Sequence, residues 1–191
     1  MKKIAIIIGF LSFSVTAQIF VGKPQSYYED KCLSKQLFLK VNEYRKSLGE
    51  SAFIWEENYY VSAKKQNDYL CINGMWGHRT NIMPGTELIV GVCGIRQELT
   101  PALYEMIVDS CIQQWKHSEW HHKTLKAPII SVASTNYKIE VSGVNLNIIL
   151  NKFGAISVNV LDYGTYKNVY CIFQLGFYKD PYKYLETPYK G

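Results

Sequence analysis

The chain has 191 residues, of which 48% are hydrophobic and 14% aromatic, and its formal net charge is +5. This length fits one domain with a hydrophobic core of ordinary size. The Lys and Arg residues are scattered, with no run longer than two. This distribution excludes the dense basic patch of a nucleic-acid-binding protein, so we expect no nucleic-acid partner.

The N-terminal residues 1–17 predict a secretory signal peptide. Lys2 and Lys3 precede an uncharged stretch that ends in Val15-Thr16-Ala17, which is typical of a cleavage site. The stretch is shorter than the roughly 20 residues of a membrane-spanning helix. Cleavage after Ala17 is therefore favoured over an anchor, and we expect a secreted or periplasmic protein with no membrane span.

Two helices are expected in the first half of the chain. Residues 18–29 show no periodicity and are expected to form an extended lead-in. Apolar residues at helical spacing then predict an amphipathic helix near residues 31–48, which Gly49 ends. A second helix is expected to follow Trp55 and to end at the Asn73-Gly74 turn.

A loop, a third helix and a set of strands complete the predicted order. Residues 74–99 are rich in glycine, which favours a loop with a short strand at 88–92. Thr100 and Pro101 are typical of the start of a third helix. Beyond Pro128 the hydrophobic period is two residues, which predicts strands at 129–134, 144–150, 155–160 and 168–177. Helices followed by strands indicate an α+β fold with an antiparallel sheet.

Four motifs occur in a fixed order along the chain. They are Trp76-Gly77-His78, Thr86-Glu87-Leu88-Ile89, Trp115-Lys116-His117-Ser118-Glu119-Trp120-His121 and Phe173-Gln174-Leu175-Gly176. This order resembles the CAP superfamily of cysteine-rich secretory, antigen-five and pathogenesis-related-one proteins, and most closely its short bacterial branch. The resemblance implies a CAP domain over residues 30–178 with a three-layer α/β/α sandwich and a central antiparallel sheet. Residues 179–191 then form a Tyr- and Lys-rich tail.

The resemblance also implies a cleft lined by histidines and acids. His78, Glu87 and His121 match three family positions, whereas Ser118 stands where animal members carry a second acid. Two neutral imidazoles and a carboxylate are suitable ligands for Zn²⁺ or another divalent metal with an open position. The alternative is that the histidines donate hydrogen bonds to backbone carbonyls and fix the loops.

Other side chains near these motifs have separate expectations. Trp76, Leu88 and Trp120 are expected to line a groove for an apolar or ring-shaped ligand. His117 and His122 do not match the family pattern and are interpreted as surface residues, although His117 and His121 would share a face if the third helix continued.

Five cysteines remain after the predicted cleavage: Cys32, Cys71, Cys93, Cys111 and Cys171. A bridge between Cys71 and Cys93 would restrain the loop that carries His78 and Glu87. The alternative is buried free thiols, since Cys111 and Cys171 fall on apolar faces of a predicted helix and strand.

The function predicted from these features is a secreted, monomeric CAP-domain binding or interaction module. Its partner would be a lipid, an envelope glycan or a protein. The sequence contains no nucleotide-binding loop, zinc-protease helix, nucleophile elbow or Cys-x-x-Cys pair. The alternative is a hydrolase in which a histidine or a bound metal activates water and Glu87 is the general base.

Overall fold

The computed structural model describes residues 23–74, 77–78, 86–127, 136–141, 144–149 and 152–176. The predicted signal peptide, the predicted strand at 129–134, the tail at 179–191 and Trp76 lie outside these residues. No helix in the described part of the chain is long and apolar enough to cross a membrane.

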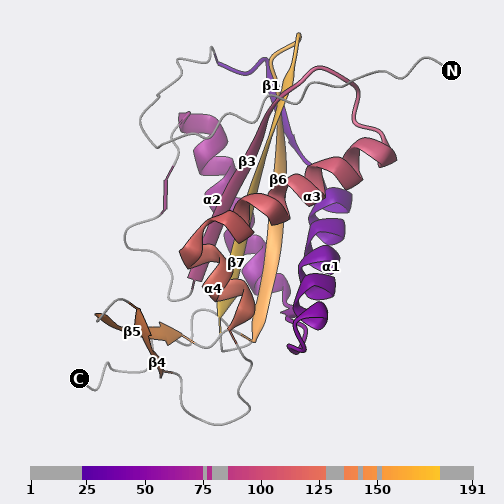
Figure 1. Ribbon diagram of the computed structural model, residues 1–191. Coiled ribbons are helices and arrows are strands. Elements are labelled where there is room, and N and C mark those ends of the chain that lie inside the picture. Colours follow the sequence, from indigo (N-terminus) through magenta and orange to yellow (C-terminus); the bar gives the residue numbers. More distant parts are fainter. Residues whose placement is uncertain are drawn as a thin grey trace, which may run out of the picture.

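A five-stranded sheet forms the middle layer of the fold (Figure 1). Its main strands are antiparallel neighbours in the order β1 (Ser26–Glu29), β6 (Phe153–Asp162), β7 (Lys167–Gly176) and β3 (Thr86–Ile95). The short β2 (Ile54–Trp55) pairs in parallel with β6. β3 is therefore an edge strand of this sheet, and the residues of the candidate site gather beside it.

A separate pair of strands follows the helices. β4 (Asn136–Val141) and β5 (Val144–Ile149) form a two-stranded antiparallel sheet.

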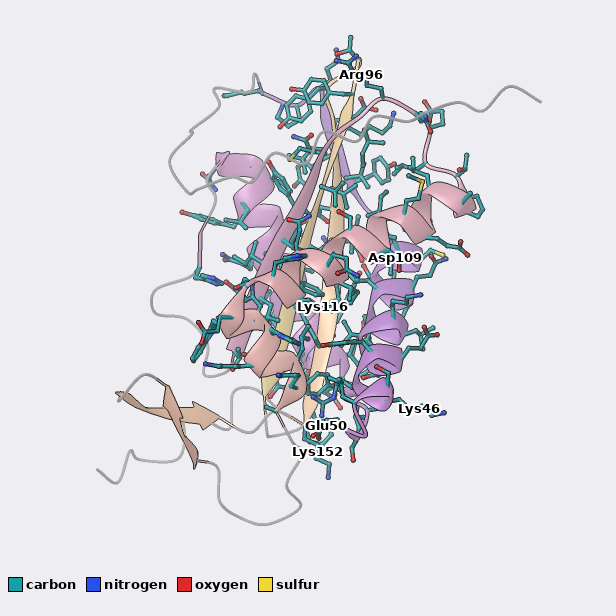
Figure 2. All side chains as sticks on the ribbon, viewed as in Figure 1. Lys46, Glu50, Arg96, Asp109, Lys116 and Lys152 are labelled. Atoms are coloured by element: carbon teal, nitrogen blue, oxygen red, sulfur yellow. The ribbon has the colours of Figure 1, made fainter. Side chains whose placement is uncertain are left out.

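Helices cover both faces of the five-stranded sheet. α1 (Lys31–Ser47), α3 (Pro101–His117) and α4 (Glu119–Lys126) lie on one side, and α2 (Glu57–Asn73) lies on the other (Figure 1). This arrangement confirms the predicted α+β fold with three layers. Charged side chains such as Arg96, Asp109 and Lys116 lie at the outside of these layers (Figure 2).

Local sequence signals explain where the helices begin and end. The Asp30 carboxylate caps α1 by accepting a hydrogen bond from the Leu33 backbone N–H at 2.9 Å. Thr100 caps α3 in the same way, with Pro101 at the first helical position. α2 ends at Gly74, whose φ of 61° lies in the left-handed region that glycine adopts without strain.

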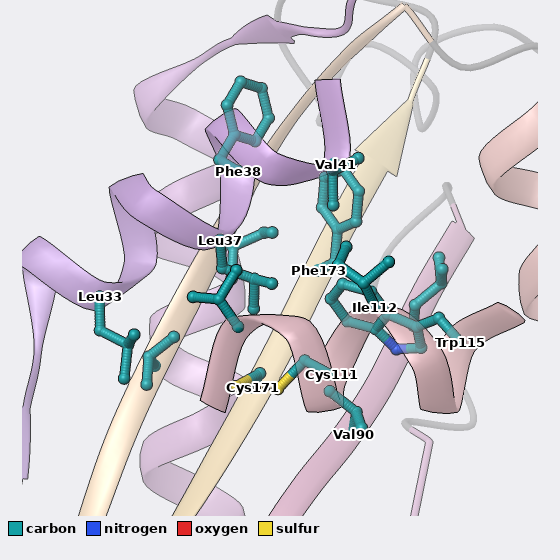
Figure 3. Close-up of a cluster of buried hydrophobic side chains, with 14 of the residues drawn as sticks. Leu33, Leu37, Phe38, Val41, Val90, Cys111, Ile112, Trp115, Cys171 and Phe173 are labelled. Atoms are coloured by element: carbon teal, nitrogen blue, oxygen red, sulfur yellow. Dashed lines mark hydrogen bonds between the residues drawn. The ribbon is translucent and has the colours of Figure 1, made fainter. Parts of the chain in front are cut away.

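An apolar core fills the space between α1, α3 and the sheet (Figure 3). Phe173 of β7 lies at its centre, with ring centroids 5.7 Å from Phe53, 5.9 Å from Phe38 and 6.0 Å from Trp115. All four side chains are buried. The predicted helices supply this core because their apolar residues recur on one face.

The opposite face of the sheet, beneath α2, carries buried polar side chains beside small apolar clusters. Asn67 of α2 donates hydrogen bonds to the backbone carbonyls of Ser157 at 3.0 Å and Tyr170 at 2.9 Å. Asn159 of β6 donates to the Asp68 carboxylate at 2.9 Å. α2 is thus held to the sheet by side-chain hydrogen bonds as well as by apolar contacts.

Candidate functional site

Glu87 is fixed in place by the register of β3 with β7. It lies opposite Gln174 in this antiparallel pair, and the Gln174 side-chain amide donates a hydrogen bond to Glu87 Oε2. Gln174 is buried, and the Glu87 side chain is only 12% exposed. The carboxylate therefore has one oxygen held by the sheet and the other available to a neighbour.

His78 is that neighbour. Its Nδ1 lies 3.1 Å from Glu87 Oε1, although the imidazole is 56% exposed. The backbone just before it is anchored to α2, because buried Gln66 donates from Nε2 to the Gly77 carbonyl at 3.2 Å. The short segment after α2 thus places one imidazole edge against the carboxylate of the edge strand.

His121 approaches the same point from the other helical layer. The chain leaves helical geometry at Ser118, with φ −84° and ψ 113°, and α4 begins at the next residue. The ring centroids of His78 and His121 are 6.4 Å apart. We name His78, Glu87 and His121 the His–Glu cluster, since the fold brings these three together from distant parts of the chain.

Contacts from α1 hold α4 in position. Buried Arg45 donates from Nη1 to the carbonyls of Leu125 at 2.5 Å and Ala127 at 3.0 Å, at the end of α4. The Tyr44 hydroxyl lies 2.6 Å from Nε2 of His122. His122, interpreted from sequence as a surface residue, is therefore half-buried and paired.

Burial also sets the charge of the second imidazole. Desolvation lowers the pKa of His121, and the neighbouring His78 lowers it further. Both causes favour the neutral imidazole of His121, which has a ring nitrogen lone pair that can accept a proton or bind a metal.

One expectation about neighbouring side chains is wrong. Leu88 does not line a groove: it is 0% exposed and belongs to the apolar core. Adjacent residues of a strand point to opposite faces, so Leu88 must face the core when Glu87 faces the other way. His117 does not share a helix face with His121, because α3 ends at His117.

The remaining predicted residues occupy separate places. His117 is exposed, with Nδ1 2.7 Å from the Gln113 carbonyl. Ser118 forms the junction of α3 and α4, where its carbonyl accepts a hydrogen bond from the His122 N–H at 2.8 Å. Trp120 is 45% exposed beside His121. Trp76 lies outside the described residues, so a groove between the two tryptophans stays a prediction.

The predicted bridge between Cys71 and Cys93 is absent from the structure, in which all five cysteines are free thiols. Cys71 belongs to α2 and is buried against the sheet, where its Sγ accepts a hydrogen bond from Asn159 of β6 at 3.5 Å. Cys93 is exposed on β3, and β7 lies between β6 and β3 in the sheet. The bridge was inferred from positions along the chain, which do not reveal the intervening strand.

Sequence reasoning missed two residues that shape the cluster. Gln174 was noted only as part of a motif, although it is the side chain that holds Glu87. Arg45 belongs to none of the four motifs, although it fixes the end of α4. For Gln174 a signal was available, because it is a polar residue at an otherwise apolar strand position.

As a ligand set, the cluster offers two imidazoles and a carboxylate that already bonds one of them. Among the described residues, no three His, Cys, Asp or Glu side chains lie close enough together to hold a metal ion as they stand. A metal ion at this cluster would be held by the two imidazoles, and Glu87 would orient His78 through their hydrogen bond.

The profile of the CAP family, the cysteine-rich secretory protein family, matches residues 38–173. The chain belongs to the CAP family. No curated protein matches this CAP chain. Among solved structures it is similar to an outer surface protein from Borrelia burgdorferi, with 12% sequence identity and a TM-score of 0.49. That similarity covers 80% of this chain and 100% of the Borrelia protein.

Proposed function

We propose that this CAP domain is an extracytoplasmic binding module and that its His–Glu cluster binds a divalent cation such as Zn²⁺. The observation that carries the proposal is an imidazole held by a carboxylate next to a second, neutral imidazole. The predicted signal peptide and the membership of a secretory family support the location.

The hydrogen bond to Glu87 prepares His78 for this role. An ionised carboxylate can only accept hydrogen bonds, so the proton of the imidazole lies on Nδ1 and the lone pair on Nε2. Metal-binding histidines commonly donate their other ring N–H to a carboxylate, which fixes the tautomer and raises the basicity of the ligand nitrogen. Gln174 supports the same carboxylate from behind.

The distance between the rings is compatible with a shared ion after a small movement. Zn–N bonds are about 2.0–2.1 Å long, and the two ring centroids are 6.4 Å apart. His78 is exposed enough to make the adjustment. Two protein ligands leave coordination positions open, and oxygen atoms of a lipid headgroup or an envelope glycan would fill them.

Calorimetric titration of ZnCl₂ into the metal-free protein tests the proposal. We expect binding by the wild type, a loss of at least roughly tenfold for His78→Ala and His121→Ala, and a loss of about 10–100-fold for Glu87→Gln. His117→Ala is the matched control, since His117 is exposed and bonded within its own helix. Equal binding by all these proteins would reject the metal role.

The same geometry favours a second function, hydrolysis. A carboxylate that orients an imidazole is the arrangement of a general base, with Nε2 of His78 free to take a proton from water. Hydrolysis of activated ester and phosphodiester reporters should then be lost in His78→Ala and strongly reduced in Glu87→Gln. Equal turnover by the wild type and His78→Ala would reject this function without affecting the metal proposal.

A further inference from the structure

Two cysteines meet inside the apolar core, away from the His–Glu cluster. Cys111 of α3 and Cys171 of β7 are both 0% exposed, and their Sγ atoms are 3.6 Å apart. Figure 3 shows the two side chains side by side between the helix and the strand. They are 60 residues apart in sequence, so the fold alone brings them together.

The other cysteines are placed differently. Cys32 and Cys93 are exposed on α1 and β3. Cys71 is buried on the α2 side of the sheet, with the polar side chains of Asn67 and Asn159 around its Sγ. Cys111 and Cys171 instead lie among the apolar side chains of the α1/α3 core.

We infer that Cys111 and Cys171 form a disulfide when the chain folds in an oxidising compartment. A disulfide has an S–S length of about 2.05 Å, so the two sulfur atoms must approach by about 1.5 Å from their present separation of 3.6 Å. A small shift of α3 toward the sheet and a side-chain rotation at each cysteine supply this approach. The bridge would tie the helical layer that carries His121 to a central strand.

The oxidant is a disulfide donor, either a protein dithiol oxidase or oxidised glutathione. One cysteine thiolate attacks a donor sulfur, which breaks the donor S–S bond, forms a mixed disulfide and releases one donor thiolate. The second cysteine thiolate attacks the mixed disulfide, which forms the Cys111–Cys171 bond and releases the other donor sulfur. The chain loses two electrons and two protons, and the donor is reduced to two thiols.

Burial determines when this exchange takes place. The hydrogen bond between the Cys171 thiol and Cys111, together with desolvation, raises the pKa of Cys171 well above its ordinary value. The thiolate is the reactive form, so the folded core is unreactive and the bond must form before the core closes. Once formed, the bond is shielded from reductants in the same way.

Peptide mapping of the wild-type chain tests whether Cys111 and Cys171 form a disulfide, and it needs no variant. The full chain is refolded from denaturant in a glutathione redox buffer, unfolded again under acidic conditions, alkylated without reduction and digested. We expect a linked peptide pair containing Cys111 and Cys171, and alkylated Cys32, Cys71 and Cys93. Alkylation of both Cys111 and Cys171, or a bridge between other cysteines, would overturn the inference. This result does not depend on export or on metal binding.

A stability measurement provides the second test. Wild type refolded with the redox pair should melt roughly 10 °C above wild type refolded with a reductant, for a closed loop of this length. The double variant Cys111→Ala/Cys171→Ala should melt at one temperature under both conditions. Cys71→Ala, the matched control for a buried cysteine outside the pair, should keep the difference. An equal melting temperature for oxidised and reduced wild type would contradict the bridge.

Discussion

The two faces of the five-stranded sheet are built from different chemistry. Beneath α1 and α3, the strands present apolar side chains that pack around Phe173. Beneath α2, the same strands present Ser157, Asn159 and Gln174, which are buried but polar. Because residues alternate along each strand, one sheet carries both faces. Burial of the apolar face stabilises the compact fold without requiring a particular partner. Each polar group on the other face requires a hydrogen-bond partner at a defined position.

Glu87 of the His–Glu cluster belongs to the polar side of this division, whereas His121 reaches it from α4 in the other helical layer. Leu88 and Val90 face the apolar core, so Glu87 faces α2 together with Ile89, which packs on Ala63. A carboxylate on the apolar face would be buried without a partner at a cost of several kcal/mol. The polar face is therefore the side of the sheet on which a charged site can be built.

The largest expected loss of stability comes from truncating the side chain at the centre of the apolar core. Phe173→Ala should lower the free energy of unfolding by about 3–5 kcal/mol, because it removes a buried ring and leaves a cavity. Urea denaturation followed by tryptophan fluorescence and circular dichroism measures the loss. Leu39→Ala is the control, since Leu39 is 62% exposed and should cost no more than about 0.5 kcal/mol. Similar losses for the two variants would mean that Phe173 is not the centre of the core.

The second largest loss of stability is expected from breaking hydrogen bonds on the polar face. Asn67→Ala should cost about 1–3 kcal/mol, because the buried carbonyl of Ser157 and the partly buried carbonyl of Tyr170 lose their side-chain donor. Asn73→Ala is the matched control on the same helix, where the amide donates to the Tyr69 carbonyl in an exposed position. A loss for Asn73→Ala equal to that for Asn67→Ala would show that the buried network adds nothing beyond a local helix contact.

The contrast between the faces also explains what the sequence could predict. The helix beginning at residue 31 and the strands after residue 150 have strong periodicity, because one side of each packs on the apolar core. β1 was expected only as an extended lead-in, since its residues are mostly exposed and show no alternation. The separation of α3 from α4 at Ser118 was missed because neither glycine nor proline marks it.

The sequence predicts the residues of the candidate site better than it predicts the side chains around them. The order of the motifs selects His78, Glu87 and His121, but Leu88 was placed beside Glu87 because the two are adjacent in sequence. Adjacent strand residues face opposite ways, so adjacency in the motif was misleading here. The role of Gln174 depends on the register of β3 with β7, which a single sequence does not specify.

A smaller effect is expected from Gln174→Ala. The variant removes the donor that holds Glu87 Oε2, and we expect a loss of stability of about 1 kcal/mol. If the His–Glu cluster binds Zn²⁺, the affinity should fall by about tenfold, because Glu87 then orients His78 less well. Denaturation and calorimetry of the same preparation separate the two effects. A large loss of stability with unchanged Zn²⁺ affinity would make Gln174 a purely structural residue.

The smallest effect is a pH dependence of stability that originates at His121. Its folded-state pKa is lowered from 6.5 by desolvation and by His78. Below pH 6.5 the unfolded chain therefore binds a proton that the folded protein resists, so stability falls as the pH decreases through this range. Above pH 6.5 both states are neutral at this residue and the effect vanishes. Denaturation in the presence of a chelator, at pH 7.5 and at pH values below 6.5, measures the difference.

Two variants assign this pH dependence to a residue. His121→Gln should flatten the decrease in stability below pH 6.5, because glutamine keeps a polar side chain that does not titrate. His117→Gln should leave the decrease unchanged, since His117 is exposed and bonded to the Gln113 carbonyl. His122 also has a lowered pKa, through desolvation and then Lys126 and Lys116, so His122→Gln should remove a further part. If the decrease persists in full when both His121 and His122 are replaced, the pH dependence comes from groups outside α4.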